Sequence, residues 1–226
     1  RPPRDSAGKR LGAPRDIKLR RKQIEIPITI GRLVKRNGRK TGVVELATFT
    51  ETAGVAVARE IEKLDKKGAD SFVLDLRGNG GGRLDQAVAI SSLFLSKGMI
   101  VATDGRARLR RQYNAIKGAV ITAEPLVVLV DRGSASASEI VSGSLKYRDR
   151  ALIVGTRTYG KGVFQEITEF DNGGAISLTV GRYELPGGHY ITKRGLTPDL
   201  KAKDDPKTSA DEALDASLAA LAAFKK

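Results

Sequence analysis

The sequence predicts an α/β fold with a layered core of short strands and crossing helices. The 226-residue chain is 40% hydrophobic, which is enough for one substantial core. Short apolar runs of strand length alternate with segments of helical periodicity. Turns rich in glycine or serine follow three of the apolar runs, where the strands of a parallel sheet would end. We therefore expect one sheet-and-helix core with three notable loops at the same edge.

The first elements surround a single amphipathic helix. Residues 1–15 are rich in Pro, Gly, Lys and Arg and predict a loop, and residues 16–27 alternate polar and apolar positions like an exposed strand. A strand is expected at 43–49. The helix is expected at 52–67, because its apolar residues recur at helical spacing and Gly68 follows as a C-cap.

The next unit repeats the alternation of strand and helix. A stretch at 72–76 that is apolar except for Asp75 predicts a strand, and the Gly-rich stretch 77–82 then breaks the chain. A second helix is expected at 84–95. Residues 97–124 show less regular patterning and contain a cluster of arginines at 106–111, so no regular element is predicted there.

Two further apolar runs complete the expected sheet. The run at 126–130 predicts a strand that leads into a helix at 136–146, and the run at 151–154 predicts the next strand. Strands connected through helices pair in parallel, so their carboxyl ends should lie at one edge.

The last part of the chain predicts a hairpin and a covering helix. Residues 164–170 and 175–185 alternate around the turn at 171–174. An amphipathic helix is expected at about 209–224, capped near Ser209, where it would cover the core.

The net charge of +14 is concentrated at the start of the chain. Residues 1–40 hold 14 Lys and Arg against three acidic residues, and no aromatic residue lies among them before Phe49. A nucleic-acid-binding surface would combine basic and aromatic side chains, so we expect no nucleic-acid partner. A solvated edge or a contact with anionic lipid headgroups fits this segment better.

Other features of composition limit the class of protein. The chain has no cysteine, which excludes disulfides and thiolate metal sites. No run approaches the ~20 apolar residues of a membrane span. Because the sequence starts at Arg1 and shows no signal peptide, we expect a fragment or a processed form.

A serine and a lysine stand out as candidate catalytic residues. Ser136 follows one predicted strand and begins a helix, where first-turn amides and the helix dipole favour an oxyanion. Lys161 lies between two glycines after the neighbouring strand. It could act as a base only if a dry pocket lowered its pKa, and its neighbours carry no charge that would oppose this. Alternatively, Ser134 or Ser136 only caps the helix.

Three other kinds of site fit the sequence less well. The stretch 155–161 resembles a phosphate-binding loop, but Gly162 stands where Ser or Thr should hold magnesium. Arg83 replaces the last glycine of a dinucleotide fingerprint. A Ser-His-Asp triad would depend on His189, the one histidine, which lies in a predicted turn.

At these residues the chain resembles the C-terminal processing peptidases, also called tail-specific proteases. The matching segments are DLRGNGGG (75–82), PLVVLVDRGSASASE (125–139), RALIVG (150–155), YGKGVFQ (159–165) and GLTPD (195–199). The resemblance implies that Ser136 is the nucleophile, Lys161 the general base and Gln165 the residue that orients the lysine. It further implies an oxyanion hole formed by the amides of Ala137 and Gly82, with Gly81 as the alternative.

The same resemblance implies the organisation and the activity. It predicts a crotonase-like or ClpP-like core at 27–226, with residues 1–26 as the last hairpin of a PDZ domain. The expected activity is a serine endopeptidase that cleaves protein substrates near apolar C-termini, in an extracytoplasmic compartment, without a metal or cofactor. The alternatives are a non-catalytic module on this core that binds peptides or apolar ligands and, less favoured, an acyl-CoA-type enzyme.

Overall fold

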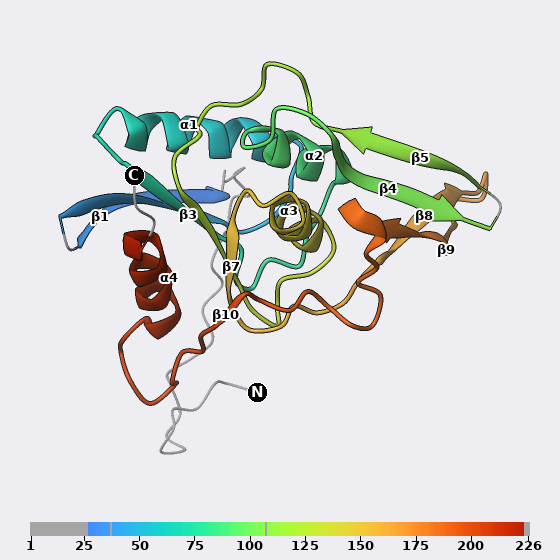
Figure 1. The fold of residues 1–226 in the computed structure, drawn as a ribbon. Helices are drawn as coiled ribbons and strands as arrows, with labels where there is room; N and C mark the ends of the chain where they lie inside the picture. The colour runs from blue at the N-terminus through green and yellow to red at the C-terminus, as the bar shows by residue number, and fades with distance from the viewer. Residues whose placement is uncertain (1–26, 37, 107, 224–226) are drawn as a thin grey trace, which may run out of the picture.

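A six-stranded sheet forms the centre of the computed structural model, which describes residues 27–36, 38–106 and 108–223. Its strands lie in the order β1-β2-β3-β6-β7-β10 (Figure 1). They are β1 (Thr29–Arg36), β2 (Arg39–Leu46), β3 (Ser71–Asp75), β6 (Leu126–Val130), β7 (Leu152–Gly155) and β10 (Leu200–Lys201). Strand β1 is antiparallel to β2, and all other neighbours pair in parallel. The α/β class and the parallel pairing are therefore confirmed.

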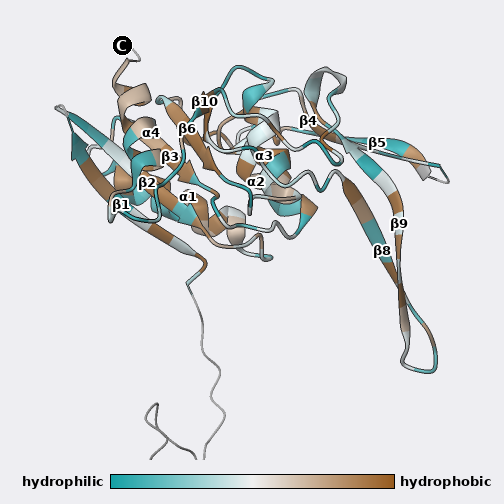
Figure 2. Cartoon of the chain, turned by 90° about the horizontal axis from the view of Figure 1, so that it is seen from below, coloured by the Kyte–Doolittle hydropathy of each residue, from teal (hydrophilic) through white to brown (hydrophobic). Residues whose placement is uncertain are grey.

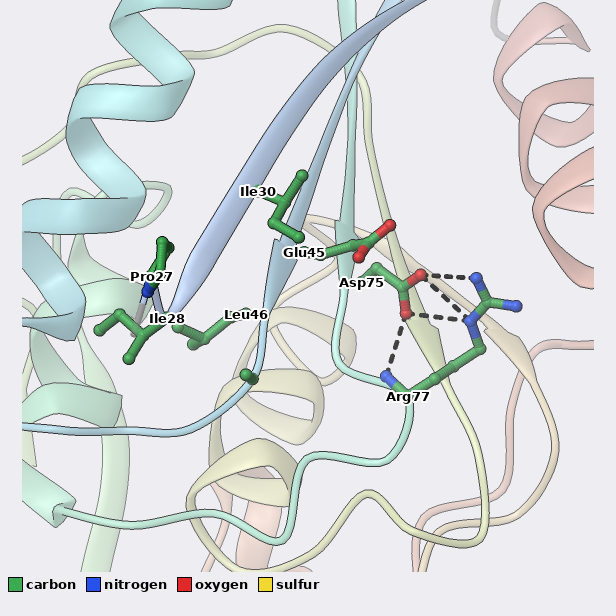
Figure 3. Close-up of a pocket in the computed structure, with 8 residues that line it drawn as sticks. Pro27, Ile28, Ile30, Glu45, Leu46, Asp75 and Arg77 are labelled. Atoms are coloured by element: carbon green, nitrogen blue, oxygen red, sulfur yellow. Dashed lines mark hydrogen bonds and ion pairs between the residues drawn. The ribbon is translucent and has the colours of Figure 1, made fainter. Parts of the chain in front are cut away.

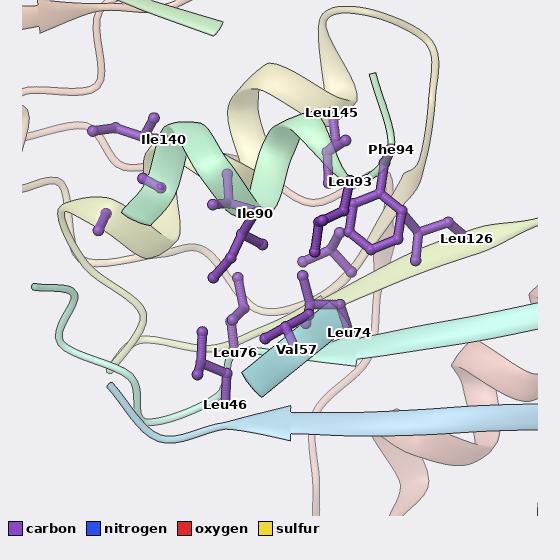
Figure 4. Close-up of a cluster of buried hydrophobic side chains, with 14 of the residues drawn as sticks. Leu46, Val57, Leu74, Leu76, Ile90, Leu93, Phe94, Leu126, Ile140 and Leu145 are labelled. Atoms are coloured by element: carbon purple, nitrogen blue, oxygen red, sulfur yellow. The ribbon is translucent and has the colours of Figure 1, made fainter. Parts of the chain in front are cut away.

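Three helices cover one face of this sheet and a fourth covers the other. The helices are α1 (Ala53–Asp65), α2 (Leu84–Ser92), α3 (Ala137–Lys146) and α4 (Glu212–Ala223). Successive residues of a strand point to opposite faces. Accordingly, Val44, Leu74 and Val128 belong to the cluster that α1, α2 and α3 complete (Figure 4). Their neighbours Val43, Val73 and Val127 pack with α4. The strands are thus apolar on both faces, as buried parallel strands are.

A second, antiparallel sheet projects from this core (Figure 2). Its strands lie in the order β5-β4-β9-β8. They are β4 (Met99–Gly105), β5 (Arg108–Asn114), β8 (Val163–Glu169) and β9 (Ala175–Glu184). The hairpin of β8 and β9 follows the prediction closely. The expectation of an irregular segment at 97–124 is wrong, because β4 pairs with both β5 and β9.

Helix boundaries differ little from the predicted ones. Helix α1 ends before Gly68, which has a φ of 82°. Helix α2 ends three residues earlier than expected, and α4 begins three residues after Ser209. Strand β1 is difficult to predict, because its arginine and lysine residues interrupt the alternation of polar and apolar positions that marks a strand. The strand expected at 16–27 and the PDZ hairpin at 1–26 lie outside the described residues, apart from Pro27.

No helix of the described part of the chain is long and apolar enough to cross a membrane.

Candidate active site

Three loops leave the same edge of the six-stranded sheet. They follow β3, β6 and β7, and the paired positions Asp75, Leu129 and Val154 show that these strands run side by side to a common edge. The loops contain the Gly-rich segment, Ser136 and Lys161 respectively. The parallel topology therefore brings together the three segments that the sequence analysis singled out.

Ser136 lies on a strained turn between β6 and α3. Its backbone has φ 55° and ψ −111°, a region that residues other than glycine rarely adopt. The side chain is half-buried, and the residue immediately precedes the first turn of α3. A sharp strand-to-helix turn that presents a serine in this way is typical of a nucleophile, and the helix N-terminus favours negative charge there.

The Gly-rich loop packs directly against this turn. A Cβ atom at Gly81 would lie 2.9 Å from both Ser136 Cβ and the amide nitrogen of Ala137, so only glycine fits. The Gly81 N–H donates to Asn79 Oδ1 at 2.9 Å. Within the described chain, the N–H groups of Gly82 and Ala137 have no hydrogen-bond partner. The two amides expected in the oxyanion hole are thus available, whereas that of Gly81 is engaged.

Asn79 holds the Gly-rich loop in place. Its side chain is fully buried, and Nδ2 donates to the carbonyl of Leu46 at 2.7 Å. Its own carbonyl accepts from the Ala135 N–H at 3.0 Å and from the Ser138 hydroxyl at 2.8 Å. Asn79 therefore connects the sheet, the Gly-rich loop and the Ser136 turn.

Glu139 connects the Ser136 turn to the Lys161 loop. This carboxylate is fully buried, and its Oε2 accepts from the amides of Ser136 and Lys161, each at 2.9 Å. Its Oε1 accepts from the Gly160 amide at 2.8 Å and from the Thr158 hydroxyl at 2.5 Å. An ionised carboxyl group, which only accepts, suits four donors. This role is not evident from the sequence, although the spacing Ser136-x-x-Glu139 is that of a capping box, and the structure forms one.

The side chains of Lys161 and Gln165 are both exposed. No hydrogen bond or ion pair joins the Lys161 amine to Ser136, to Gln165 or to another residue in the described ranges. Gln165 lies on β8, where its backbone is opposite Thr179. The dry pocket expected around Lys161 is therefore not formed in this structure; only the main chain of Lys161 is fixed beside Ser136.

The remaining candidate, His189, lies on a different part of the surface. Its ring stacks on Tyr147, with centroids 3.8 Å apart and planes 9° apart. It makes no hydrogen bond to Ser136 among the described residues. This arrangement disfavours a Ser-His-Asp triad.

Arg77, at the start of the Gly-rich loop, forms an ion-pair cluster with the C-terminal segment. Its guanidinium group donates to Asp75 at 2.6 Å, to Asp204 at 3.0 Å and to Asp211 at 2.8 Å. Burial opposes the charge of Arg77, but Asp75 and Asp211 raise its pKa. Burial likewise acts to raise the pKa of Asp211, but the hydrogen bond from Arg77, the hydrogen bond from the Leu214 amide and the charge of Arg77 together lower that pKa overall. The cluster thus joins the Gly-rich loop to the segment that leads into α4.

The Asp75–Arg77 pair also borders a pocket of about 310 Å³ (Figure 3). Its other lining residues are Pro27, Ile28, Ile30, Glu45, Leu46 and Ala47. None of the predicted catalytic or oxyanion-hole residues lines it. No group of three or more His, Asp or Glu side chains gathers as a metal site in the described ranges.

Comparisons with known proteins agree with this arrangement of loops. The model of peptidase family S41 matches residues 40–202. A carboxyl-terminal-processing protease of Picosynechococcus is 38% identical over 192 residues, which are 85% of this chain and 46% of that protein. The chloroplastic carboxyl-terminal-processing peptidase 2 of Arabidopsis thaliana is 43% identical, over 72% of this chain and 32% of that protein.

A solved structure gives the same result. The photosystem II D1 C-terminal processing protease superposes with a TM-score of 0.74 at 32% identity, and the match covers 85% of this chain and 53% of that one. The chain spans about half the length of such relatives or less. From the family model and the identity to these relatives, we conclude that the chain belongs to peptidase family S41.

Proposed function

We propose that this chain is the core of a serine endopeptidase that cleaves protein substrates near apolar C-termini, with Ser136 as nucleophile and Lys161 as general base. The observation that carries the proposal is the junction at Glu139. One carboxylate oxygen binds the amides of both residues, so their main chains meet at a single atom. The unpartnered amides of Gly82 and Ala137 beside the Ser136 turn supply donors for an oxyanion.

The proposed reaction uses these groups in sequence. Lys161 in its neutral form takes the hydroxyl proton of Ser136 as Oγ attacks the scissile carbonyl. The amides of Gly82 and Ala137 hold the tetrahedral oxyanion, and Lys161 then returns the proton to the leaving amine. Water, deprotonated by the same lysine, hydrolyses the acyl-enzyme and releases Ser136.

The exposed Lys161 side chain requires one movement before catalysis. Its amine must turn toward Ser136 and lose water, because a solvated lysine stays protonated at neutral pH. Bound substrate would cover the site and supply this dry environment. Gln165, two strand positions beyond Val163 on β8, would then orient the amine.

The names of the relatives support the choice of substrate. Several are named for processing of carboxyl termini, one of them that of photosystem II D1. We extend to this chain the cleavage of C-terminal segments, an extracytoplasmic location, a crotonase-like core and residues 1–26 as the last hairpin of a PDZ domain. Contact of the basic N-terminal segment with a membrane surface belongs to the same proposal.

A non-catalytic binding module is the second candidate. It is favoured by the absence of a hydrogen bond between the Lys161 amine and Ser136 within the described ranges. Such a module would bind peptides without reacting at Ser136.

Cleavage of an unfolded protein with an apolar C-terminal tail tests the proposal. Intact-mass spectrometry should find truncated product with the wild type, and a loss of at least ~1,000-fold in rate with Ser136→Ala and Lys161→Ala. Lys97→Ala, at an exposed lysine, is the matched control and should retain full activity. Cleavage by Ser136→Ala at the wild-type rate would refute the assignment. A wild type that neither cleaves nor reacts with a fluorophosphonate at Ser136 would support the binding module.

A further inference from the structure

Another pocket, of about 390 Å³, lies beside the Lys161 loop. Val163 lines it and follows Lys161 by two residues, which is about 7 Å of extended chain. Val163 is paired with Arg182 across β8 and β9, so these two side chains leave the same face of the antiparallel sheet. The pocket therefore adjoins the residue that is proposed as the general base. Its full lining is Val163, Arg182, Tyr190, Thr192 and Arg194.

The other wall of this pocket is main chain that packs against the same loop. The Lys193 N–H donates to the carbonyl of Gly160 at 2.9 Å. A Cβ atom at Gly162 would lie 2.6 Å from the amide nitrogen of Thr192, so the two segments touch at their backbones. Because a hydrogen bond and this close contact hold the two walls together, the main chain sets the position of the pocket relative to the proposed base.

The charge of the pocket favours an anionic ligand. Among the described residues that line it, two are arginines and none is acidic. Within the described ranges, the exposed guanidinium group of Arg194 forms no ion pair. Arg182 donates to Asp104 at 3.3 Å and lies over the ring of Tyr190, 4.2 Å from its centroid. Arginine binds carboxylates through two parallel N–H donors, so Arg194 is a free partner for such a group.

One polar atom of a lining residue lacks a partner. Thr192 Oγ1 is buried and makes no hydrogen bond in the described part of the chain. A buried hydroxyl without a partner costs free energy, so native structures rarely contain one. A rotation of the side chain toward the pocket would let this hydroxyl donate to a bound acceptor. A carboxylate, with two acceptor oxygens, can bind a guanidinium group and a hydroxyl together.

The proposed reaction indicates which part of a substrate would lie in this pocket. Lys161 gives its proton to the leaving amine, so the leaving segment lies on the lysine side of the scissile bond. When a protein is cleaved near its C-terminus, the leaving segment carries the terminal carboxylate. An extended peptide advances ~3.3 Å per residue, so a tail of a few residues would reach from the scissile bond into the pocket.

We infer that this pocket binds the terminal carboxylate of the substrate tail, with Arg194 as the main partner and Arg182 and Thr192 as further donors. This inference rests on the proposed function, because that function supplies the direction of the substrate. The pocket would then select substrates by the end of the chain, and the side chains of the tail would contribute less to recognition.

Binding of a short fluorescein-labelled peptide with an apolar tail tests the inference. The peptide is made with a free C-terminal carboxylate and with a carboxamide, and fluorescence anisotropy is measured with Ser136→Ala, which should not consume it. We expect the free acid to bind roughly tenfold to a hundredfold more tightly than the amide, because the amide loses a charge-assisted pair. Arg194→Gln in the same background should remove most of this preference and leave the affinity for the amide within about twofold.

Two further variants show whether the effect belongs to the pocket. Arg59→Gln, at an exposed arginine of α1, removes the same charge elsewhere and should keep the full preference for the free acid. Thr192→Val keeps the volume of the side chain and removes the hydroxyl. It should weaken binding of the free acid by a smaller factor than Arg194→Gln does and leave binding of the amide unchanged.

The outcomes separate the inference from the proposed function. Equal affinity for acid and amide, or binding of neither peptide, would overturn the inference. A preference that survives the combined substitutions Arg182→Gln and Arg194→Gln would also overturn it, because the carboxylate would then be bound elsewhere. None of these readouts requires cleavage. Cleavage that persists in Ser136→Ala would instead overturn the proposed function.

Discussion

The two halves of the candidate site are built in opposite ways. The half that holds the proposed nucleophile, formed by the Ser136 turn and the Gly-rich loop, is fastened through the fully buried Asn79 and Glu139. The half that holds the proposed base, formed by Lys161 and the hairpin of β8 and β9, is fixed at the main chain of Lys161, whereas the side chains of Lys161 and Gln165 are exposed. Figure 2 shows this hairpin extending away from the core.

The difference indicates which part of the site is rigid and which side chains can move. A strained turn and a close glycine contact need a rigid frame, and the packed parallel sheet supplies it. The role proposed for Lys161, in which substrate desolvates its amine, needs the opposite, a side chain that can turn on a fixed backbone. The Glu139 carboxylate joins the two halves, because it accepts hydrogen bonds from the amides of both Ser136 and Lys161.

Removing the Glu139 carboxylate should have the largest effect on stability and activity. Glu139→Ala would leave four donors, two of them buried, without an acceptor, so we expect the free energy of unfolding to fall by about 3–5 kcal/mol and activity to be lost. Denaturant unfolding followed by circular dichroism measures the first effect. Glu62→Ala, at an exposed glutamate of α1, is the control and should unfold like the wild type. Equal stability of the two variants would mean that the loops hold together without the carboxylate.

The Arg77 cluster offers a weaker test of how the nucleophile half is held. The pKa of Asp211 is below its ordinary value, so its contribution to stability is present above that ordinary value and is lost as pH falls through the lowered one. We expect the thermal midpoint to drop between about pH 5 and pH 2, and Asp211→Asn to drop less steeply. Because the carboxylate is partly exposed, the contribution should be about 1 kcal/mol or less. Identical pH profiles for the two proteins would show that the cluster contributes nothing.

The smallest effect is expected on the projecting hairpin. Ile167 is 70% exposed on β8, so Ile167→Ser should change the free energy of unfolding by less than ~0.5 kcal/mol. Val128→Ala, at a fully buried position of β6, should cost about 2 kcal/mol in the same assay. If the hairpin variant instead loses stability like the core variant, this half of the molecule is as tightly built as the other.

The sequence alone predicts much of this structure, for identifiable reasons. The stretches at 72–76 and 126–130 are buried on both faces and are apolar at every position except Asp75, which makes parallel strands recognisable. Strand β5 is hard to recognise because its sequence contains arginines of the 106–111 cluster, which obscure any alternation of polar and apolar residues. The role of Glu139 cannot be predicted, since nothing in a sequence reveals which backbone amides a buried carboxylate will bind. The exposure of Lys161 likewise depends on how the hairpin is placed, which no local pattern encodes.

The positive φ of Ser136 affects which residue selection for stability would favour at this position. Glycine adopts φ 55° without strain, so Ser136→Gly should recover part of the 1–3 kcal/mol or so stored at such a position. The best residue for folding at this position is therefore not the one that can react. With Ser136 as the proposed nucleophile, a population of variants screened for heat resistance alone should drift toward glycine at this position and toward inert chains.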